Sequence, residues 1–439
     1  MRARLQKFAQ DAADAFWLLP AGLVAVGCGL GLGLPEVERS GLIPVGALAG
    51  WVYSGGETGA RTLLGAIAGS AIGVAGTIFS ITIAALTLAS QQMGPRLLRN
   101  FTKDRGNQWT LGVLLGTFGY SLMVLRVIRG ADENAFVPQM AVTIGILLGL
   151  CCIGMLVFFV HHVATRINVD TVIELVHRDL IARIDSLTHQ GPAPAAPAAR
   201  DWTGAGEIAA QGSGYLQQID ESGLADWAAE QGRAVKLLVK PGDYVFPGAV
   251  IAWVAPACEA GEHAVHRAIA LGGSRTSPLD LTYAVRQLVE VAVRALSPGI
   301  NDPMTAMSVL DRLGDALCVL AGRELPSGVV TRDGSLLLEM ASPTYEEVLA
   351  AMLQLIRQSA SSSPAVLTHL LGVMAEVARQ EPRPERRLAL RGAIDAAAAA
   401  GRRALPAGTD LVELERAHRT ALQAARSPGR KLIPILAAI

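Results

Sequence analysis

An uncharged apolar run from Leu63 to Gln91 carries a row of small and hydroxyl side chains along one side. Residues three, four and seven positions apart share a face of a helix. The run is longer than the about 20 residues that cross a bilayer. We therefore predict a membrane helix whose small, polar face meets other helices or water instead of lipid. The row comprises Ser70, Gly73, Thr77, Ser80, Ala84, Thr87 and Gln91.

Three further runs are long and apolar enough to cross a membrane: Phe16–Leu34, Trp109–Val127 and Val137–Val160. The polar residues before Phe16 do not resemble a cleaved signal sequence, so we expect that run to be retained. Gly41–Tyr53 is apolar but too short to span, and is either a re-entrant or an interfacial piece. The pattern predicts an α-helical membrane domain of four spans.

Basic residues set the expected orientation of these spans. They precede the first span, follow the fourth, and lie between the second and third, whereas the other two loops are more acidic. The positive-inside rule then places both termini in the cytoplasm. Arg96 and Arg99 follow the second span, which would put them at the inner mouth of any pore that this span lines.

Glycines at helical spacing predict close packing of the membrane helices. Gly65, Gly69 and Gly73 form two overlapping GxxxG steps in the second span, and Gly112 and Gly116 form another in the third. Such steps let helix backbones approach one another. Helix packing is therefore an alternative explanation for part of the small-residue row.

After the spans, the pattern predicts a cytoplasmic α+β region. A helix over Val169–Leu187 has one apolar face, which either packs on the soluble region or pairs between subunits. A stiff Pro/Ala linker follows it. We divide the chain into a membrane domain (1–165), the connecting helix and linker (166–200), a small β subdomain (201–256) and a mainly helical subdomain (257–439).

Short alternating runs over Trp202–Ala255 read as strands broken by Pro241-Gly242 and Pro247-Gly248. The phrase PGDYVFPGAVIAWV resembles half of a biotinyl/lipoyl-type barrel-sandwich fold, so a small β-barrel-like subdomain is expected. Asp333-Gly334 suits the turn of a later hairpin. Helices are predicted over Leu281–Leu296, Pro303–Ala321, Tyr345–Gln358, Pro364–Gln380, Pro384–Arg403 and Asp410–Arg426.

Composition narrows the function classes. Charged residues are 17% of the chain, against about 25% in soluble proteins, and the mean hydropathy is +0.37. The formal net charge is zero, and no basic patch or motif points to nucleic acid. Five cysteines show no zinc-type spacing, so neither a metal nor a cofactor is expected.

The densest polar cluster lies in the soluble region, at Arg275, Asp280, Arg294, Asn301 and Asp302. Asp302 before Pro303 suits a helix N-cap, which is a structural reading. The functional alternative is an anion or phosphoryl site at that helix N-terminus, with Arg275 or Arg294 nearby. No P-loop, nucleophile elbow, zinc-protease or dinucleotide motif occurs.

Three separated motifs indicate a family resemblance. TIFSITIAALTLASQQMGPRLLRNFTKD (77–104), RTSPLD (275–280) and RALSPGINDPMTA (294–306) resemble the predicted bacterial membrane proteins of domain-of-unknown-function family 2254. The resemblance covers nearly the whole chain and implies a bacterial inner-membrane location. It supplies no activity.

The sequence favours a homo-oligomeric ion channel, with the second span lining the pore, an anion-leaning inner mouth and a cytoplasmic regulatory domain. The expected partners are the lipid bilayer, further copies of the chain and small ions. One alternative is a membrane-anchored ligand sensor or scaffold without a pore. A third is an enzyme acting on lipid or phosphate esters near Asp280, Asn301 and Asp302, but no nucleophile–base set is visible, so no enzyme is expected.

Overall fold

The computed structural model describes residues 16–40, 52–93, 104–129, 136–166, 168–191, 200–275 and 280–426; side chains at 89–93 and 166 are outside this description. The chain divides into two compact units, each of which is described by itself. The membrane unit spans Gln10–Gln91 and Pro95–Asn168. The second unit holds Val169–Ile439 together with Met1–Ala9 and Gln92–Gly94.

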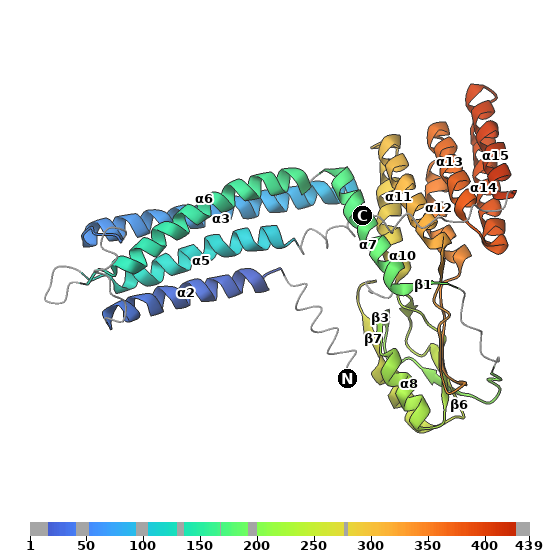
Figure 1. Ribbon diagram of the computed structural model, residues 1–439, viewed down its shortest axis with the longest axis horizontal. Coiled ribbons are helices and arrows are strands. Elements are labelled where there is room, and N and C mark those ends of the chain that lie inside the picture. The colour runs from blue at the N-terminus through green and yellow to red at the C-terminus, as the bar shows by residue number, and fades with distance from the viewer. Residues whose placement is uncertain are drawn as a thin grey trace. The chain divides into compact units, whose positions relative to one another are not determined.

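The described part of the membrane unit contains four apolar helices that run side by side (Figure 1). All four are long and apolar enough to cross a membrane, which confirms the predicted spans. Most of Gly41–Tyr53 lies outside the described residues, so its place relative to the membrane stays open. The helices are α2 (Leu18–Arg39), α3 (Glu57–Met93), α5 (Arg105–Val127) and α6 (Gln139–Arg166).

Glycines bring α2 and α5 into backbone contact. A Cβ added to Gly27 would lie 2.3 Å from the carbonyl oxygen of Gly116, and one on Gly31 would lie 2.7 Å from that of Tyr120. On the other helix, a Cβ on Gly112 would meet the Leu23 side chain at 2.4 Å. The predicted step at Gly112 and Gly116 is thus used for close helix packing.

Large side chains fill the interior of the membrane unit. Leu64 of α3 is fully buried in one cluster with Tyr120 and Val142, and Ile78 is buried in another with Leu114 and Phe159. The Tyr120 hydroxyl donates a 2.6 Å hydrogen bond to the Ala141 carbonyl oxygen. This unit is therefore a packed bundle with α5 as its most buried helix.

Polar contacts fix the N-terminal end of α5. Asp104 is its N-cap and accepts a 2.9 Å hydrogen bond from the Gly106 amide. The other Asp104 carboxylate oxygen lies 2.7 Å from Nε2 of His162 on α6. Phe158, one turn earlier on α6, stacks on the His162 ring. These contacts tie the start of α5 to the end of α6.

The second unit begins with α7 (Val169–Leu187), which matches the predicted helix. Its apolar residues pack on α10 (Leu281–Ala295) and α11 (Pro303–Ala321) of the same unit. Two side-chain contacts reinforce the α11 contact: the ion pair of Glu174 with Arg312 at 3.1 Å, and His177 Nε2 with a carboxylate oxygen of Asp315 at 2.9 Å. Of the two predicted roles for this helix, the structure shows packing on the soluble region. The buried residues are Val172, Ile173, Val176, Leu180 and Ile184.

The described strands form small open sheets, and none closes into a barrel. A five-stranded sheet has the order β2-β6-β4-β10-β9, a three-stranded sheet the order β5-β3-β7, and β1 pairs with β8. The α+β class is confirmed, but the sheets do not close into the barrel expected from PGDYVFPGAVIAWV. The strands are β1 (His189–Gln190), β2 (Gly206–Ala209), β3 (Gly214–Ile219), β4 (Ala234–Leu237), β5 (Tyr244–Val245), β6 (Val250–Ala255), β7 (Ile269–Gly272), β8 (Arg323–Glu324), β9 (Val329–Arg332) and β10 (Ser335–Met340).

The predicted hairpin at Asp333-Gly334 joins β9 to β10. Asp333 and Gly334 have φ values of 50° and 76°, which suits the two left-handed positions of a type I′ turn. Two elements differ from the expected pattern. Helix α8 (Glu221–Glu230) interrupts the strand region, capped by Asp220, and β7 follows the short helix α9 (Glu259–Ala268) in a region expected to be helical.

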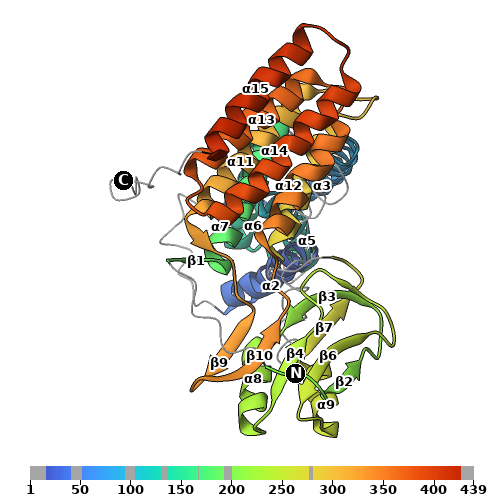
Figure 2. The same cartoon turned by 90° about the vertical axis from the view of Figure 1, so that its right-hand side faces the viewer.

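The rest of this unit is a helical bundle at one end, whereas most of the strands lie at the other end together with α8 and α9 (Figure 2). Every predicted helix from Leu281 onward is present, and each observed end lies within one residue of the predicted end. The remaining helices are α12 (Tyr345–Ser359), α13 (Pro364–Gln380), α14 (Pro384–Ala404) and α15 (Thr409–Arg426).

Candidate functional site

The small-residue row on α3 lies on the side of the helix that the other described residues leave uncovered. Six of its seven residues, from Ser70 to Thr87, are exposed. The buried side of α3 points the other way, since residues advance about 100° per position. The row is therefore separate from the face that packs inside the bundle. The buried face comprises Ala60, Leu64, Ala68, Ala71, Ala75 and Ile78.

The glycines of this face also lack neighbours in the described structure. A Cβ added to Gly65, Gly69, Gly73 or Gly76 would meet no atom within 4 Å. The glycines of α2 and α5 behave differently, because they sit against helix backbone. Among the described residues, the GxxxG steps of α3 thus meet no other helix, and packing between described helices does not explain the row.

Hydroxyl groups on this face bond to their own helix. Thr77 donates to the Gly73 carbonyl oxygen at 3.1 Å, Ser80 to that of Gly76 at 3.0 Å, and Thr87 to that of Ile83 at 2.9 Å. Each hydroxyl proton is therefore engaged, while the oxygen retains a lone pair directed outward. The face offers hydrogen-bond acceptors to whatever covers it.

Apolar side chains border the row. Ile72, Phe79 and Ile83 have exposed fractions of 40%, 52% and 47%, and they suit contact with lipid. The α3 helix thus has a packed face, lipid-compatible flanks and a small, polar face. The Gln91 side chain and residues Arg96 and Arg99, predicted for the inner end, lie outside the described residues.

In the second unit, Arg275 and Asp280 lie together. Arg275 Nε is 3.3 Å from a carboxylate oxygen of Asp280. Asp280 is buried and caps α10, accepting hydrogen bonds from the Thr282 amide at 2.9 Å and hydroxyl at 2.6 Å. The Asp280 side chain packs on Gly242 of the Pro241-Gly242 turn, where a Cβ would approach it to 2.2 Å. Asp280 thus holds the strand region against the start of α10.

Asn301 and Asp302 lie beyond the other end of α10, in the turn that follows Arg294. Asn301 has a φ of 49°, and Asp302 caps α11 by accepting from the Thr305 amide at 3.1 Å and hydroxyl at 2.6 Å. These bonds lower the pKa of Asp302 below its ordinary value. Because α10 has 15 residues, about 22 Å of helix separates Asp280 from this turn. The five predicted residues do not converge on one site.

A buried ionic cluster, not singled out from the sequence, joins β8, the start of α12 and the turn between α13 and α14. Arg383 Nη2 lies 2.6 Å from a carboxylate oxygen of Glu324, and the Arg386 guanidinium lies 4.9 Å from the centre of the Tyr345 ring. Glu381 is fully buried beside both arginines, and burial raises its pKa despite them. The charge-dense stretch Glu381–Arg387 was the sequence signal for this cluster.

The described residues contain no group of three or more His, Cys, Asp or Glu side chains that could hold a metal ion. Asp280 and Asp302 of the second unit are engaged as helix caps, and the arginines of the ionic cluster are paired with Glu324 and Glu381. The α3 face is the largest set of predicted site residues that the described structure leaves exposed together. It is therefore the candidate functional site.

Comparison with known proteins agrees with the membrane assignment. The family model described as "Predicted membrane protein (DUF2254)" matches residues 13–376. Similar proteins include the uncharacterized proteins MT1328 of Mycobacterium tuberculosis and Mb1321c of Mycobacterium bovis. Each is 33% identical over 433 residues, covering 94% of this chain and 81% of the relative. No solved structure matches the chain.

Proposed function

The chain belongs to the DUF2254 family of predicted membrane proteins, and on that premise we propose that it forms a homo-oligomeric ion channel of the bacterial inner membrane. Helix α3 of each copy lines a shared pore, and the unit that begins at Val169 regulates it. Both termini are on the cytoplasmic side, as the positive-inside rule favours. The proposal involves no catalytic step.

The uncovered face of α3 is the observation that carries this proposal. A membrane face built of glycine, alanine and hydroxyl side chains gains little from contact with lipid, but it suits close helix contact or water. Because large side chains fill the interior of the bundle, a conducting path would lie between copies and not within one. The outward lone pairs of Thr77, Ser80 and Thr87 would then face the water of the pore.

Selectivity in this proposal comes from the inner mouth. The engaged hydroxyl protons of the α3 face offer no donor to an anion. Arg96 and Arg99 would supply the positive charge that favours anions. In this proposal, the selectivity of the channel for anions therefore comes from these two arginines and not from the side chains of α3 that line the pore.

Regulation would pass through the link between α6 and α7. Only Ile167 and Asn168 separate the end of α6 at Arg166 from the start of α7 at Val169. Helix α7 is anchored to α10 and α11 by its buried apolar face, and to α11 also by the side-chain contacts of Glu174 and His177. A rearrangement in the second unit that moves α7 would thus act on the end of membrane helix α6 through this two-residue connection.

Flux from liposomes tests the proposal. Purified protein reconstituted with a chloride gradient is expected to release chloride faster than protein-free liposomes. Thr77→Phe and Ser80→Phe should each reduce the rate strongly, because an aromatic ring would obstruct a bore lined by small side chains. Ile72→Phe adds similar bulk on a flank of the same helix and should leave the rate unchanged. No chloride or potassium release, or equal rates in all variants, would contradict the proposal.

A second candidate function is a membrane-anchored sensor or scaffold without a pore. The open space beside Gly65, Gly69 and Gly73 favours it, because such steps suit a dry helix–helix interface between copies. In that case the purified protein is oligomeric but releases neither ion, and Gly69→Leu dissociates the copies. The flux assay separates the two functions.

A further inference from the structure

Helices α11, α13 and α15 of the second unit run side by side and leave a groove of about 640 Å³ over them (Figure 2). The floor of this groove is apolar and comprises Met307 of α11 with Ala365, Gly372 and Val373 of α13. The groove follows α13, and α11 and α15 form its two walls.

Gly372 opens the middle of the groove. It is exposed in the interior of α13, where glycine is less favourable than alanine. A Cβ added to Gly372 would meet no described atom within 4 Å, so packing against the described residues does not require glycine there. Without a side chain at this position, the backbone of a bound segment is able to approach α13 closely.

The dimensions of the groove match one side of a helix. Its lining extends along α13 from Ala365 to Glu376, and these eleven positions correspond to about 16 Å, or about three helical turns. Divided by this length, the volume corresponds to a cross-section of about 40 Å², about half that of a helix 10 Å in diameter. A helix would therefore lie in the groove with about half of its thickness enclosed.

One end of the groove is acidic. Asp410 and Glu413, near the start of α15, belong to its lining, and both side chains are exposed. A Cβ added to Gly401 of α14 would meet Leu414 at 2.4 Å and Leu367 at 3.3 Å. The start of α15 is thus level with the start of α13, which places the two carboxylates at that end of the groove.

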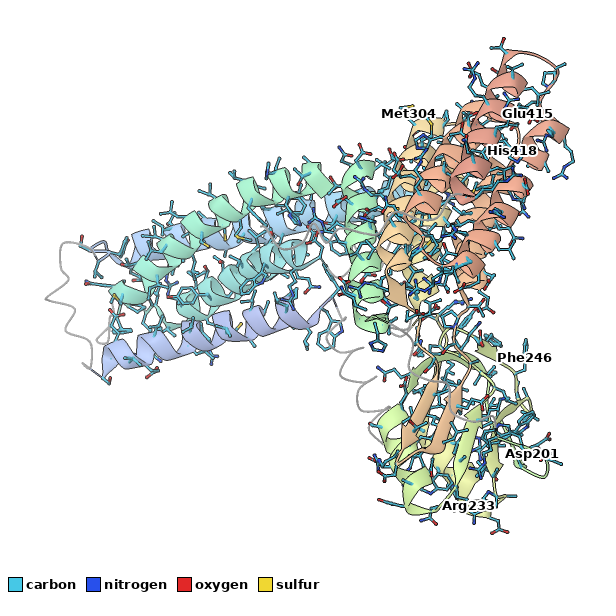
Figure 3. The ribbon with its side chains drawn as sticks, turned by 45° about the vertical axis from the view of Figure 1, so that its right-hand side comes forward. Asp201, Arg233, Phe246, Met304, Glu415 and His418 are labelled. Atoms are coloured by element: carbon cyan, nitrogen blue, oxygen red, sulfur yellow. The ribbon has the colours of Figure 1, made fainter. Side chains whose placement is uncertain are left out.

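Other charged side chains of α15 are engaged with α14. Arg402 Nη2 lies 2.9 Å from a carboxylate oxygen of Glu415, and His418 Nε2 lies 2.8 Å from one of Asp395. Glu415 and His418 lie close together on α15 (Figure 3). Glu413 is two positions before Glu415, which is about 200° around the helix. It therefore points away from the contact with α14.

The other end of the groove is acidic as well. Glu376, near the end of α13, is exposed there and pairs with Arg379 of the same helix. On the α11 wall, a carboxylate oxygen of Asp311 lies 2.7 Å from His369 Nε2. The residues that line the groove include carboxylates at both ends and neither lysine nor arginine. An occupant with basic residues at both ends and an apolar middle would complement this pattern.

We propose that the groove over α11, α13 and α15 binds a basic amphipathic helix of a partner protein. The apolar side of that helix packs on Met307 and Val373 and approaches α13 most closely at Gly372. Lysine or arginine side chains about eleven positions apart lie beside Glu376 at one end and beside Asp410 at the other. This arrangement is the helix-in-groove mode of recognition, with charge fixing the register.

Binding of a synthetic helix to the full-length protein tests this proposal. The protein is placed in nanodiscs of zwitterionic phosphatidylcholine, which carry no net charge to attract a basic peptide. The probe is a fluorescent leucine/lysine peptide of about 18 residues with its leucines at helical spacing. Fluorescence anisotropy should show saturable binding that is absent with empty nanodiscs. A leucine/glutamate peptide of the same pattern should not bind.

A matched pair of glycine variants locates the binding site. Gly372→Leu fills the groove and should weaken binding by about tenfold or more, because a clash built against a partner lowers affinity. Gly392→Leu should bind like wild type. Gly392 is also exposed within a helix, α14, with no described atom within 4 Å of an added Cβ. Circular dichroism should show the same helix content for both variants.

A charge variant gives a second readout that does not depend on Gly372. Asp410→Asn combined with Glu413→Gln should weaken binding by about threefold or more and make it less sensitive to salt. No saturable binding of the lysine peptide, equal binding by the two glycine variants, or equal binding of the glutamate peptide would each overturn the proposal. It would also be overturned if the lysine peptide did not bind and Gly372→Leu dissociated oligomers, because the occupant would then be a second copy.

Discussion

At the scale of residues, the motifs of the second unit act mainly as helix caps and turns. Asp280 and Asp302 each accept hydrogen bonds from a backbone amide and a threonine hydroxyl at a helix start. Asn301 takes the left-handed conformation that the turn before α11 requires. Propensities alone predicted the caps. The predicted helix over Leu281–Leu296 already places Asp280 and Asp302 at its opposite ends, so their separation follows from that prediction, and grouping them as one cluster was wrong.

Removing the Asp302 cap is expected to destabilise the second unit. Asp302→Ala should cost about 1 kcal/mol, which lowers the melting temperature by about 2–4 °C for a unit of this size. The lowered pKa of Asp302 means that the bonded carboxylate contributes fully at neutral pH. Its contribution is lost as the pH falls through the lowered pKa of the folded state.

Thermal unfolding of wild type and variant at pH 7 and at pH 3 checks this effect. The difference between the two proteins should shrink at pH 3. Asp302→Asn, which retains an acceptor, should lose less stability at pH 7 than Asp302→Ala. Equal melting temperatures at pH 7, or a larger difference at pH 3, would exclude the capping role.

At the scale of elements, sequence patterns predicted most helices because their starts carry local signals. Proline at the first position marks α11, α13 and α14, and Thr344 with Glu347 forms a capping box on α12. Helix α8 was not predicted because it lies within Trp202–Ala255, where short alternating runs indicated strands. The four-residue strand β7 was not predicted, because so short an apolar run fits a strand or a helix equally well.

The glycine steps show where local patterns stop being informative. Gly112–Gly116 and Gly65–Gly69 look alike in the sequence, yet of the two only the first lies against another helix in the described part of the chain. Which glycine meets a partner depends on the arrangement of all four helices. Long-range packing of this kind has no counterpart in sequence spacing.

The contact between α2 and α5 leads to a paired prediction. Gly27→Leu should force the backbones apart, because its Cβ would lie 2.3 Å from the Gly116 carbonyl oxygen. We expect a loss of about 1–3 kcal/mol, visible as a lower melting temperature in detergent. Gly29→Leu, two positions away with open space beside it, should melt like wild type. Similar melting of both variants would refute the close packing.

At the scale of the whole molecule, the chain is a membrane protein whose second apolar helix keeps one face uncovered. That face was visible in the sequence as a row of small and hydroxyl residues. The sequence could not distinguish packing within the chain from contact outside it. Among the described residues, the buried side of α3 lies opposite the row. The proposed channel places water in a shared pore against this face, and the second candidate function places a dry contact between copies there.

Water access to the α3 face tests the central claim most directly. With the five native cysteines replaced, single cysteines at Thr77, Ser80, Ile72 and Phe79 are exposed to a charged, membrane-impermeant thiol reagent in reconstituted oligomers. A thiol reacts as thiolate, which requires water. The account predicts modification at 77 and 80, with loss of ion flux, and none at 72 and 79. Unreactive cysteines at 77 and 80, or equal reactivity at all four positions, would contradict it.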